Sequence, residues 1–188
     1  MKKVLFLDID GTLVNYRNQI PQSTVIAVSK ARQNGHKLII CTGRAKGEIN
    51  PSIKELRFDG YICGNGCYIE ADDQVIYNKV FSLDELKEIF AWLDERKIYY
   101  FIECESSLVG RKEIIPYGNL AAVRFLKLMN NPRAEEMGLM GLFPSLVFSD
   151  DLLRSDVNKV SYFVNKTEDY YECEQRFPQY NNSLWGEG

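Results

Sequence analysis

Residues 4–14 read VLFLDIDGTLV, in which four apolar residues are followed by two acids, Asp8 and Asp10, with Ile9 between them. The run at 4–7 is continuously apolar and does not alternate, as is typical of a parallel-sheet strand covered on both faces. It therefore predicts a central strand. Gly11 permits the tight turn that we expect after the acids, because glycine adopts backbone conformations that other residues avoid.

The same pattern of apolar strand and polar loop recurs twice downstream. Residues 21–36 (PQSTVIAVSKARQNGH) predict a helix with Pro21 near its start and Gly35 as its stop. Residues 37–44 (KLIICTGR) and 58–66 (FDGYICGNG) each predict a strand that ends in small polar residues, with a helical stretch between them. Three such units joined by helices indicate a doubly wound α/β domain.

The pattern changes after residue 66. Residues 67–78 (CYIEADDQVIYN) alternate around an Asp-Asp turn and predict a β-hairpin. From Ser82 the chain reads as a separate α+β module, with strands at 99–110 and 157–164, helices at 82–97, 119–131 and 167–177, and the start of a last strand at 181–188. We therefore expect an α/β core over 1–79 and an α+β domain over 80–188.

Composition excludes several classes of protein. The 188 residues carry 23 Lys and Arg against 26 Asp and Glu, and no basic stripe is present, so nucleic-acid binding is disfavoured. The five cysteines are scattered in apolar runs, which suits reduced thiols, and Cys63 with Cys67 lacks the further ligands of a zinc site. With no signal peptide and no membrane span evident, we expect a cytoplasmic protein without a membrane partner.

The acidic turn has a chemical interpretation. Ligands of open α/β sheets gather at the carboxyl ends of the strands, where Asp8, Thr42 and Asn65 all fall. A carboxylate at position 8 can attack phosphorus and form an acyl-phosphate. Asp10 can then protonate the leaving group and later take a proton from water. Two acids beside a phosphate repel it and each other, so this chemistry requires a cation such as Mg²⁺.

The second strand supplies further candidates. The Thr42 hydroxyl and the amides near Gly43, at the start of a helical segment, form a plausible phosphate cradle. Arg44 has two open roles, because it can donate to the substrate or form a salt bridge with a neighbouring acid.

These motifs resemble those of a known family. LFLDIDGTL with IICTGR resembles motifs I and II of the haloacid dehalogenase-like phosphatases, and YICGNGCYI resembles the NG segment of their Cof-type branch. The resemblance implies a Rossmann-like core with an inserted C2-type cap. It also implies Asp8 as nucleophile, Asp10 as acid/base, and Thr42 as the phosphate-binding hydroxyl. Mg²⁺ would sit on Asp8 and the Asp10 backbone carbonyl, and Gly43, Arg44 and Asn65 are candidate substrate contacts.

Two later motifs of the family are not found. Lys159 is the nearest lysine to a strand but falls in the expected cap, and Asp150 and Asp151 precede it, which reverses the family order. We expect an incomplete core that lacks motifs III and IV, with reduced Mg²⁺ affinity and turnover. We also expect residues 4–9 to form an open apolar sheet edge through which the protein self-associates.

The resulting expectation is an Mg²⁺-dependent phosphatase of a small phosphorylated metabolite such as a sugar phosphate. A phosphomutase and a noncatalytic phosphate-ligand or interaction module remain alternatives. Arg111 and Lys112 are possible anion binders in the cap, although a solvated turn is the simpler interpretation of their loop.

Overall fold

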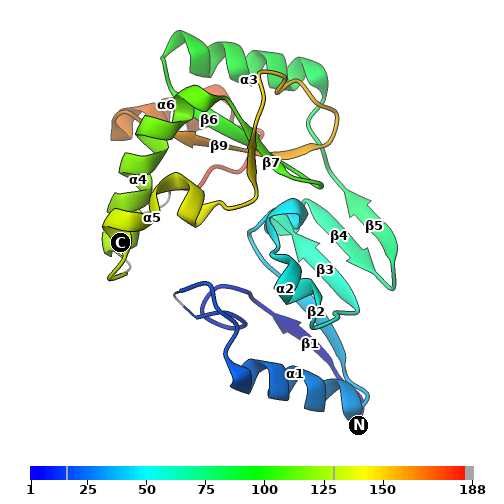
Figure 1. Cartoon of the computed structure of the whole chain (residues 1–188). Helices are drawn as coiled ribbons and strands as arrows, with labels where there is room; N and C mark the ends of the chain where they lie inside the picture. The colour runs from blue at the N-terminus through cyan, green and yellow to red at the C-terminus, as the bar shows by residue number, and fades with distance from the viewer. Residues whose placement is uncertain (16, 129, 185–188) are drawn as a thin grey trace.

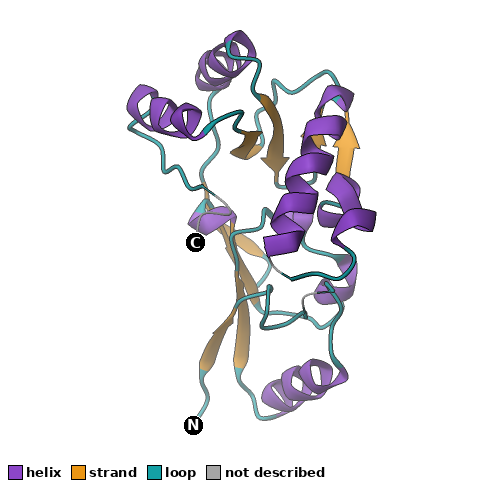
Figure 2. Cartoon of the chain, turned by 90° about the vertical axis from the view of Figure 1, so that its left-hand side faces the viewer, coloured by secondary structure: helices purple, strands orange, loops and turns teal. Residues whose placement is uncertain are grey.

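The protein contains two sheets, each with its own helices, and both are visible in Figure 1 and, from the side, in Figure 2. The structure is a computed structural model that describes residues 1–15, 17–128 and 130–184. The first sheet uses strands between residues 4 and 78, and the second uses strands between 99 and 163. This mixed α/β architecture is the fold class expected from the sequence.

The first sheet, which we call the core sheet, has five strands in chain order. They are β1 (Val4–Leu7), β2 (Lys37–Cys41), β3 (Gly60–Cys63), β4 (Tyr68–Ala71) and β5 (Gln74–Asn78). The first three run parallel, and the hairpin β4–β5 continues the sheet in antiparallel pairing. The hairpin and the repeated strand units were therefore predicted correctly.

The helices of the core are α1 (Gln22–Gln33), α2 (Pro51–Lys54) and the short 3₁₀ turns η1 (Lys46–Glu48) and η2 (Gly64–Gly66). An apolar cluster between helices and sheet holds them together: Ile9, Leu13, Val14, Val28, Leu38, Ile40, Ile49, Ile53, Cys63 and Tyr68. Three members of this cluster come from the turn after β1, so burial of that turn positions the acids on either side of Ile9.

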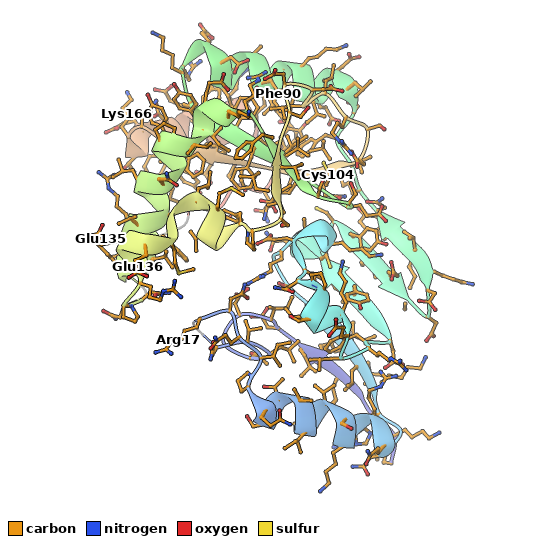
Figure 3. The ribbon with its side chains drawn as sticks, in the orientation of Figure 1. Arg17, Phe90, Cys104, Glu135, Glu136 and Lys166 are labelled. Atoms are coloured by element: carbon orange, nitrogen blue, oxygen red, sulfur yellow. The ribbon has the colours of Figure 1, made fainter. Side chains whose placement is uncertain are left out.

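The second sheet, which we call the cap sheet, has the order β8 (Leu146–Phe148), β7 (Leu108–Gly110), β6 (Tyr99–Cys104) and β9 (Val157–Phe163). Its helices are α3 (Leu83–Glu95), η3 (Lys112–Ile114), α4 (Ile115–Leu128), α5 (Ala134–Leu142) and α6 (Thr167–Arg176). Helix α3 begins with the expected capping box, in which Ser82 and Glu85 satisfy each other's backbone amides. Figure 3 shows Phe90 and Cys104 inside this part of the molecule.

Each face of the cap sheet has its own apolar cluster. One cluster joins β6 and β9 to α3 and α6 through residues such as Phe90, Tyr100 and Phe177. The other contains Phe101, Leu139 and other residues of α5 and the sheet. Because adjacent strand residues face opposite sides, Tyr100 and Phe101 belong to different clusters. Among the described residues, no helix combines the length and apolar character that a bilayer-spanning helix requires.

Several sequence predictions differ from the structure. Strand β1 pairs with β2 at one end of the core sheet, so the prediction of a central, doubly covered strand is wrong, whereas the open edge expected for residues 4–9 is found at Val4–Leu7. Residues 99–110 form two strands joined by a turn. Helix α5 and strand β8 were not predicted, and Gly138, with a φ of 54°, interrupts the helical conformation of α5. Residues 181–184 form no strand, and 185–188 lie outside the described residues.

The free edge at β1 carries exposed apolar side chains. Val4 is 53% exposed and Phe6 is 62% exposed, on the face away from the core cluster. A free edge with apolar side chains is a template for pairing with another chain. Self-association through this edge remains a prediction, as it was from the sequence.

We expect Phe6→Lys to lower self-association, because a charge on an edge strand opposes pairing. Light scattering over a range of protein concentrations measures this, with Ile76→Lys as the control at the other end of the sheet, where Ile76 is also exposed. Loss of association in the Ile76 variant and not in the Phe6 variant would contradict the prediction.

Candidate active site

The carboxyl ends of the three parallel strands lie level with one another. Leu7 of β1 lies opposite Ile40 of β2, and Cys41 of β2 lies opposite Ile62 of β3. The residues that follow these strands therefore meet at one edge of the core sheet. Asp8, Thr42 and Asn65 are brought to this edge, as the sequence predicted.

Asp8 presents an exposed carboxylate at this edge. Its Oδ1 accepts a hydrogen bond from the Ile9 amide at 2.8 Å. The next residues form a tight turn in which the Ile9 carbonyl accepts bonds from three amides, those of Thr12, Leu13 and Val14, at 2.9–3.3 Å. Ile9 itself is fully buried, which fixes the turn. Asp8 is thus held on rigid backbone while its carboxylate faces solvent.

Asp10 is engaged by Arg44. The guanidinium donates through Nε at 2.9 Å and through Nη2 at 2.7 Å to the two carboxylate oxygens, and Nη2 also reaches Asn18 at 3.3 Å. Burial of Arg44 is the largest single effect and disfavours its charge, but the hydrogen bonds to Asp10 and the negative charges of Asp10, Glu48 and Asp8 together outweigh it, so the pKa of Arg44 lies above its usual value. Of the two roles open to Arg44, the structure shows the ion pair.

Thr42 and Gly43 form the loop after β2. Thr42 is 6% exposed, and its Oγ1 accepts a bond from the Arg44 amide at 3.2 Å. A Cβ at Gly43 would lie 2.8 Å from Oδ1 of Asn65, so glycine lets the two loops touch. Asn65 has a left-handed φ of 56°. The helical segment after Gly43 consists only of η1 and the four-residue α2, too short for the strong helix dipole expected from the sequence.

A cap lysine reaches the same loop. Lys159 of β9 donates to the Gly43 carbonyl at 3.2 Å and pairs with Glu103 of β6 at 2.8 Å. Glu103 is 1% exposed, and its other oxygen accepts from Ser161 at 2.5 Å. Sequence analysis noted Lys159 but did not place it beside the site, because 116 residues separate it from Gly43.

Glu48 lies at the junction between core and cap, and sequence analysis did not single it out. Burial is the main reason that its pKa is raised to about 7. Glu103 and Asp10 raise the pKa further, while Arg44 and Lys159 act in the opposite direction. The neighbouring Gly47 presses against the cap, since a Cβ there would lie 2.3 Å from the Ser107 amide.

The remaining candidates lie elsewhere. Arg111 bonds within the cap to Asp94 and Tyr100, at 3.3 and 3.2 Å, which ties it to the α3 side of the cap sheet. Lys112 is exposed at the start of η3. Asp150 and Asp151 are exposed after β8, as expected for a surface loop. Burial raises the pKa of the Cys63 thiol to about 12, which keeps it protonated at neutral pH.

Mg²⁺ fits part of this donor set. Asp8 offers an exposed carboxylate, the kind of oxygen ligand that Mg²⁺ prefers, whereas both carboxylate oxygens of Asp10 accept from Arg44. Within the described parts of the chain, no three or more His, Cys, Asp and Glu side chains gather as a metal site. Mg²⁺ commonly binds through one or two carboxylates together with water and substrate phosphate, and Asp8 supplies one such carboxylate.

Comparison with known proteins agrees with the motifs at this edge. A model of the haloacid dehalogenase-like hydrolases matches residues 5–186. The chain belongs to the haloacid dehalogenase-like hydrolase family. Its relatives include the putative phosphatase YkrA of Bacillus subtilis, 32% identical over 95 residues, which are 50% of this chain and 37% of YkrA. They also include the pyridoxal phosphate phosphatase YbhA of Escherichia coli, 40% identical over 68 residues, 36% of this chain and 25% of YbhA.

Solved structures share the fold. The sugar phosphatase BT4131, of HAD subclass IIB, superposes with a TM-score of 0.65 at 25% identity, covering 95% of this chain and 64% of that one. A hypothetical protein from Geobacillus kaustophilus has a TM-score of 0.78 at 19% identity, with 99% and 66% covered. The matched stretches thus span about a third or less of YkrA and YbhA and about two thirds of these solved chains.

The raised pKa of Glu48 gives a pH-dependent stability. Because the folded protein holds this proton more tightly than the unfolded chain, stability falls as pH rises from about 4.5 through about 7. In buffer without divalent cations, we expect Glu48→Gln to raise the free energy of unfolding at pH 8 by about 2 kcal/mol. At pH 4 we expect almost no difference from the wild type.

Urea unfolding at both pH values measures this effect. The exposed Glu55, in the same segment, supplies the matched control Glu55→Gln, which we expect to change stability little at either pH. A Glu48→Gln variant that is less stable than the wild type at pH 8 would show that the carboxylate is stabilising in its charged form.

Proposed function

We propose that the chain carries the nucleophile and phosphate-binding half of an Mg²⁺-dependent phosphoric monoester hydrolase. The observation that carries this proposal is the asymmetry of the two acids. Both acids are exposed, but Arg44 donates to both carboxylate oxygens of Asp10, whereas Asp8 accepts from the Ile9 amide. One carboxylate is therefore available to attack, and the other is oriented beside it.

Asp8 acts as the nucleophile in this proposal. One of its carboxylate oxygens bonds to phosphorus as the bond between phosphorus and the ester oxygen breaks, giving an aspartyl-phosphate and an alkoxide leaving group. The Thr42 hydroxyl, beside the Gly43 loop, binds a phosphate oxygen. Arg44 and Asn65 contact the same phosphate or the ester group attached to it. Mg²⁺, when bound at Asp8, offsets the negative charge shared by carboxylate and phosphate.

Asp10 acts as the acid and then as the base. Once it has taken up a proton from solvent, it donates that proton to the ester oxygen as the bond to phosphorus breaks, and it later takes a proton from the water that hydrolyses the aspartyl-phosphate. Both of its oxygens contact Arg44, so at least one contact must open before Asp10 can transfer a proton. Arg44 therefore positions the acid and opposes its premature movement.

Small phosphorylated metabolites are the proposed substrates, and sugar phosphates are one such class. A pyridoxal phosphate phosphatase and a sugar phosphatase among the related proteins support this range. We place the activity in the cytoplasm, which agrees with the five free cysteines. A phosphomutase would use the same aspartyl-phosphate and remains within the same chemistry.

A noncatalytic phosphate-binding or interaction module is the second candidate. It is favoured by the absence of a cluster of three acidic, histidine or cysteine ligands among the described residues. Asp8 alone would then hold the cation only weakly, and the site would bind phosphate without turning it over.

Hydrolysis of p-nitrophenyl phosphate with and without Mg²⁺ distinguishes the two functions. We expect Mg²⁺-dependent turnover that falls at least about 1,000-fold in Asp8→Asn, because the nucleophile is lost. Asp10→Asn should lose about 100-fold or more with this good leaving group, since removal of the base still slows hydrolysis of the aspartyl-phosphate.

The exposed Asp150→Asn serves as the control and should retain wild-type rates. If the protein binds phosphate but shows no turnover that depends on Asp8 and Mg²⁺, the hydrolase proposal is contradicted and the binding module is favoured.

A further inference from the structure

A cavity of about 660 Å³ opens beside the candidate active site and runs along the cap sheet. Gly43 and Asn65 line it at the core, and Phe101, Lys159, Ser161 and Phe163 line it on the cap sheet. The cavity thus begins at the loops that would hold the phosphate. Its volume lies within the roughly 300–1,000 Å³ typical of small-molecule sites.

The strand register arranges polar and apolar groups in sequence along this cavity. Glu103 lies opposite Lys159, Phe101 opposite Ser161, and Tyr99 opposite Phe163. These pairs share one face of the sheet, because they are two residues apart on each strand. Lys159 contacts the Gly43 carbonyl, so the charged pair is at the core end of the row and the aromatic pair is at the far end.

Helices α4 and α5 also line the cavity, mainly with apolar side chains such as Ala121, Phe125, Leu139 and Phe143, and with the cation Arg124. From Lys159 to Phe163 the strand advances about 13 Å, at about 3.3 Å per residue. This length accommodates a fused-ring group beyond a phosphate.

Several further polar residues line the cavity, among them Arg124, Asn181, Asn182 and Ser183. Two lining tyrosines have partners of their own. The Tyr162 hydroxyl contacts Asn182 at 3.5 Å, and the Tyr170 hydroxyl donates to Glu174 at 2.8 Å. At the core end, Ser161 and Lys159 both contact Glu103. Lys159 is the cation positioned to bind an oxygen of the ester or a substituent close to it.

We infer that this cavity binds the leaving group of a phosphate monoester whose body is aromatic or otherwise apolar, with Lys159 contacting an oxygen near the phosphate. The inference rests on the proposed function for the position of the phosphate. A sugar phosphate fits less well, because its hydroxyl groups would lose water without gaining partners among the aromatic and aliphatic side chains of the cavity.

Calorimetric titration in the presence of Mg²⁺ tests this, with 1-naphthyl phosphate and glucose 6-phosphate as the two esters. We expect at least tenfold tighter binding of the naphthyl ester by the wild type. Ala121→Trp fills the cavity and should remove this preference while leaving binding of inorganic phosphate unchanged. Ala91→Trp places the same side chain on the exposed face of α3 and is the matched control.

Fluorescence titration with 1-naphthol, which has no phosphate, separates the cavity from the catalytic proposal. Binding of 1-naphthol to the wild type and Ala91→Trp, but not to Ala121→Trp, supports the cavity even if no ester is hydrolysed. Equal affinity for the two esters, with Asp8-dependent hydrolysis of both, would overturn the inference and leave the phosphatase proposal intact. The comparison of the two esters uses the wild type alone, so its result holds even if Ala121→Trp does not fold.

Discussion

The ion pair between Arg44 and Asp10 is the interaction on which the site depends. Arg44 binds both oxygens of Asp10 through a forked pair of hydrogen bonds, while the Asp8 carboxylate accepts from the Ile9 amide. Arg44 is also bound to the loop that carries Thr42, because its backbone amide donates to the Thr42 hydroxyl. The charge balance of the acids and the shape of the phosphate loop are therefore set by one residue.

The cap takes part in this charge balance from the other side. Lys159 connects the buried Glu103 to the Gly43 carbonyl, so a strand of the cap touches the proposed phosphate loop directly. Glu48 lies between these groups, and burial keeps its pKa near neutrality. A cap joined to the core by polar contacts can change its position at lower cost than one joined by an apolar interface, which suits a site that must admit substrate and release product.

Local patterns predicted much of this structure, and long-range contacts account for most of what they missed. Apolar runs and turn residues were sufficient for the three parallel strands, the hairpin and α3, because each depends on residues close in sequence. The apolar residues of β1 by themselves indicated a central strand, and its position at the sheet edge was expected only because two later family motifs are not found. The ion pair of Arg44 was one of two open roles, and the contact of Lys159 with Gly43 was not foreseen, since only the folded chain brings them together.

The central claim is that Asp8, and not Asp10, forms a covalent bond to phosphorus. The protein is mixed with 1-naphthyl phosphate and Mg²⁺, quenched rapidly and treated with borohydride, which reduces an acyl-phosphate of aspartate to homoserine. Mass spectrometry of the peptide containing residues 4–14 then locates the reduced position. The account predicts homoserine at position 8 and intact aspartate at position 10. Turnover with reduction at position 10, or with no reduction at either position, would contradict it.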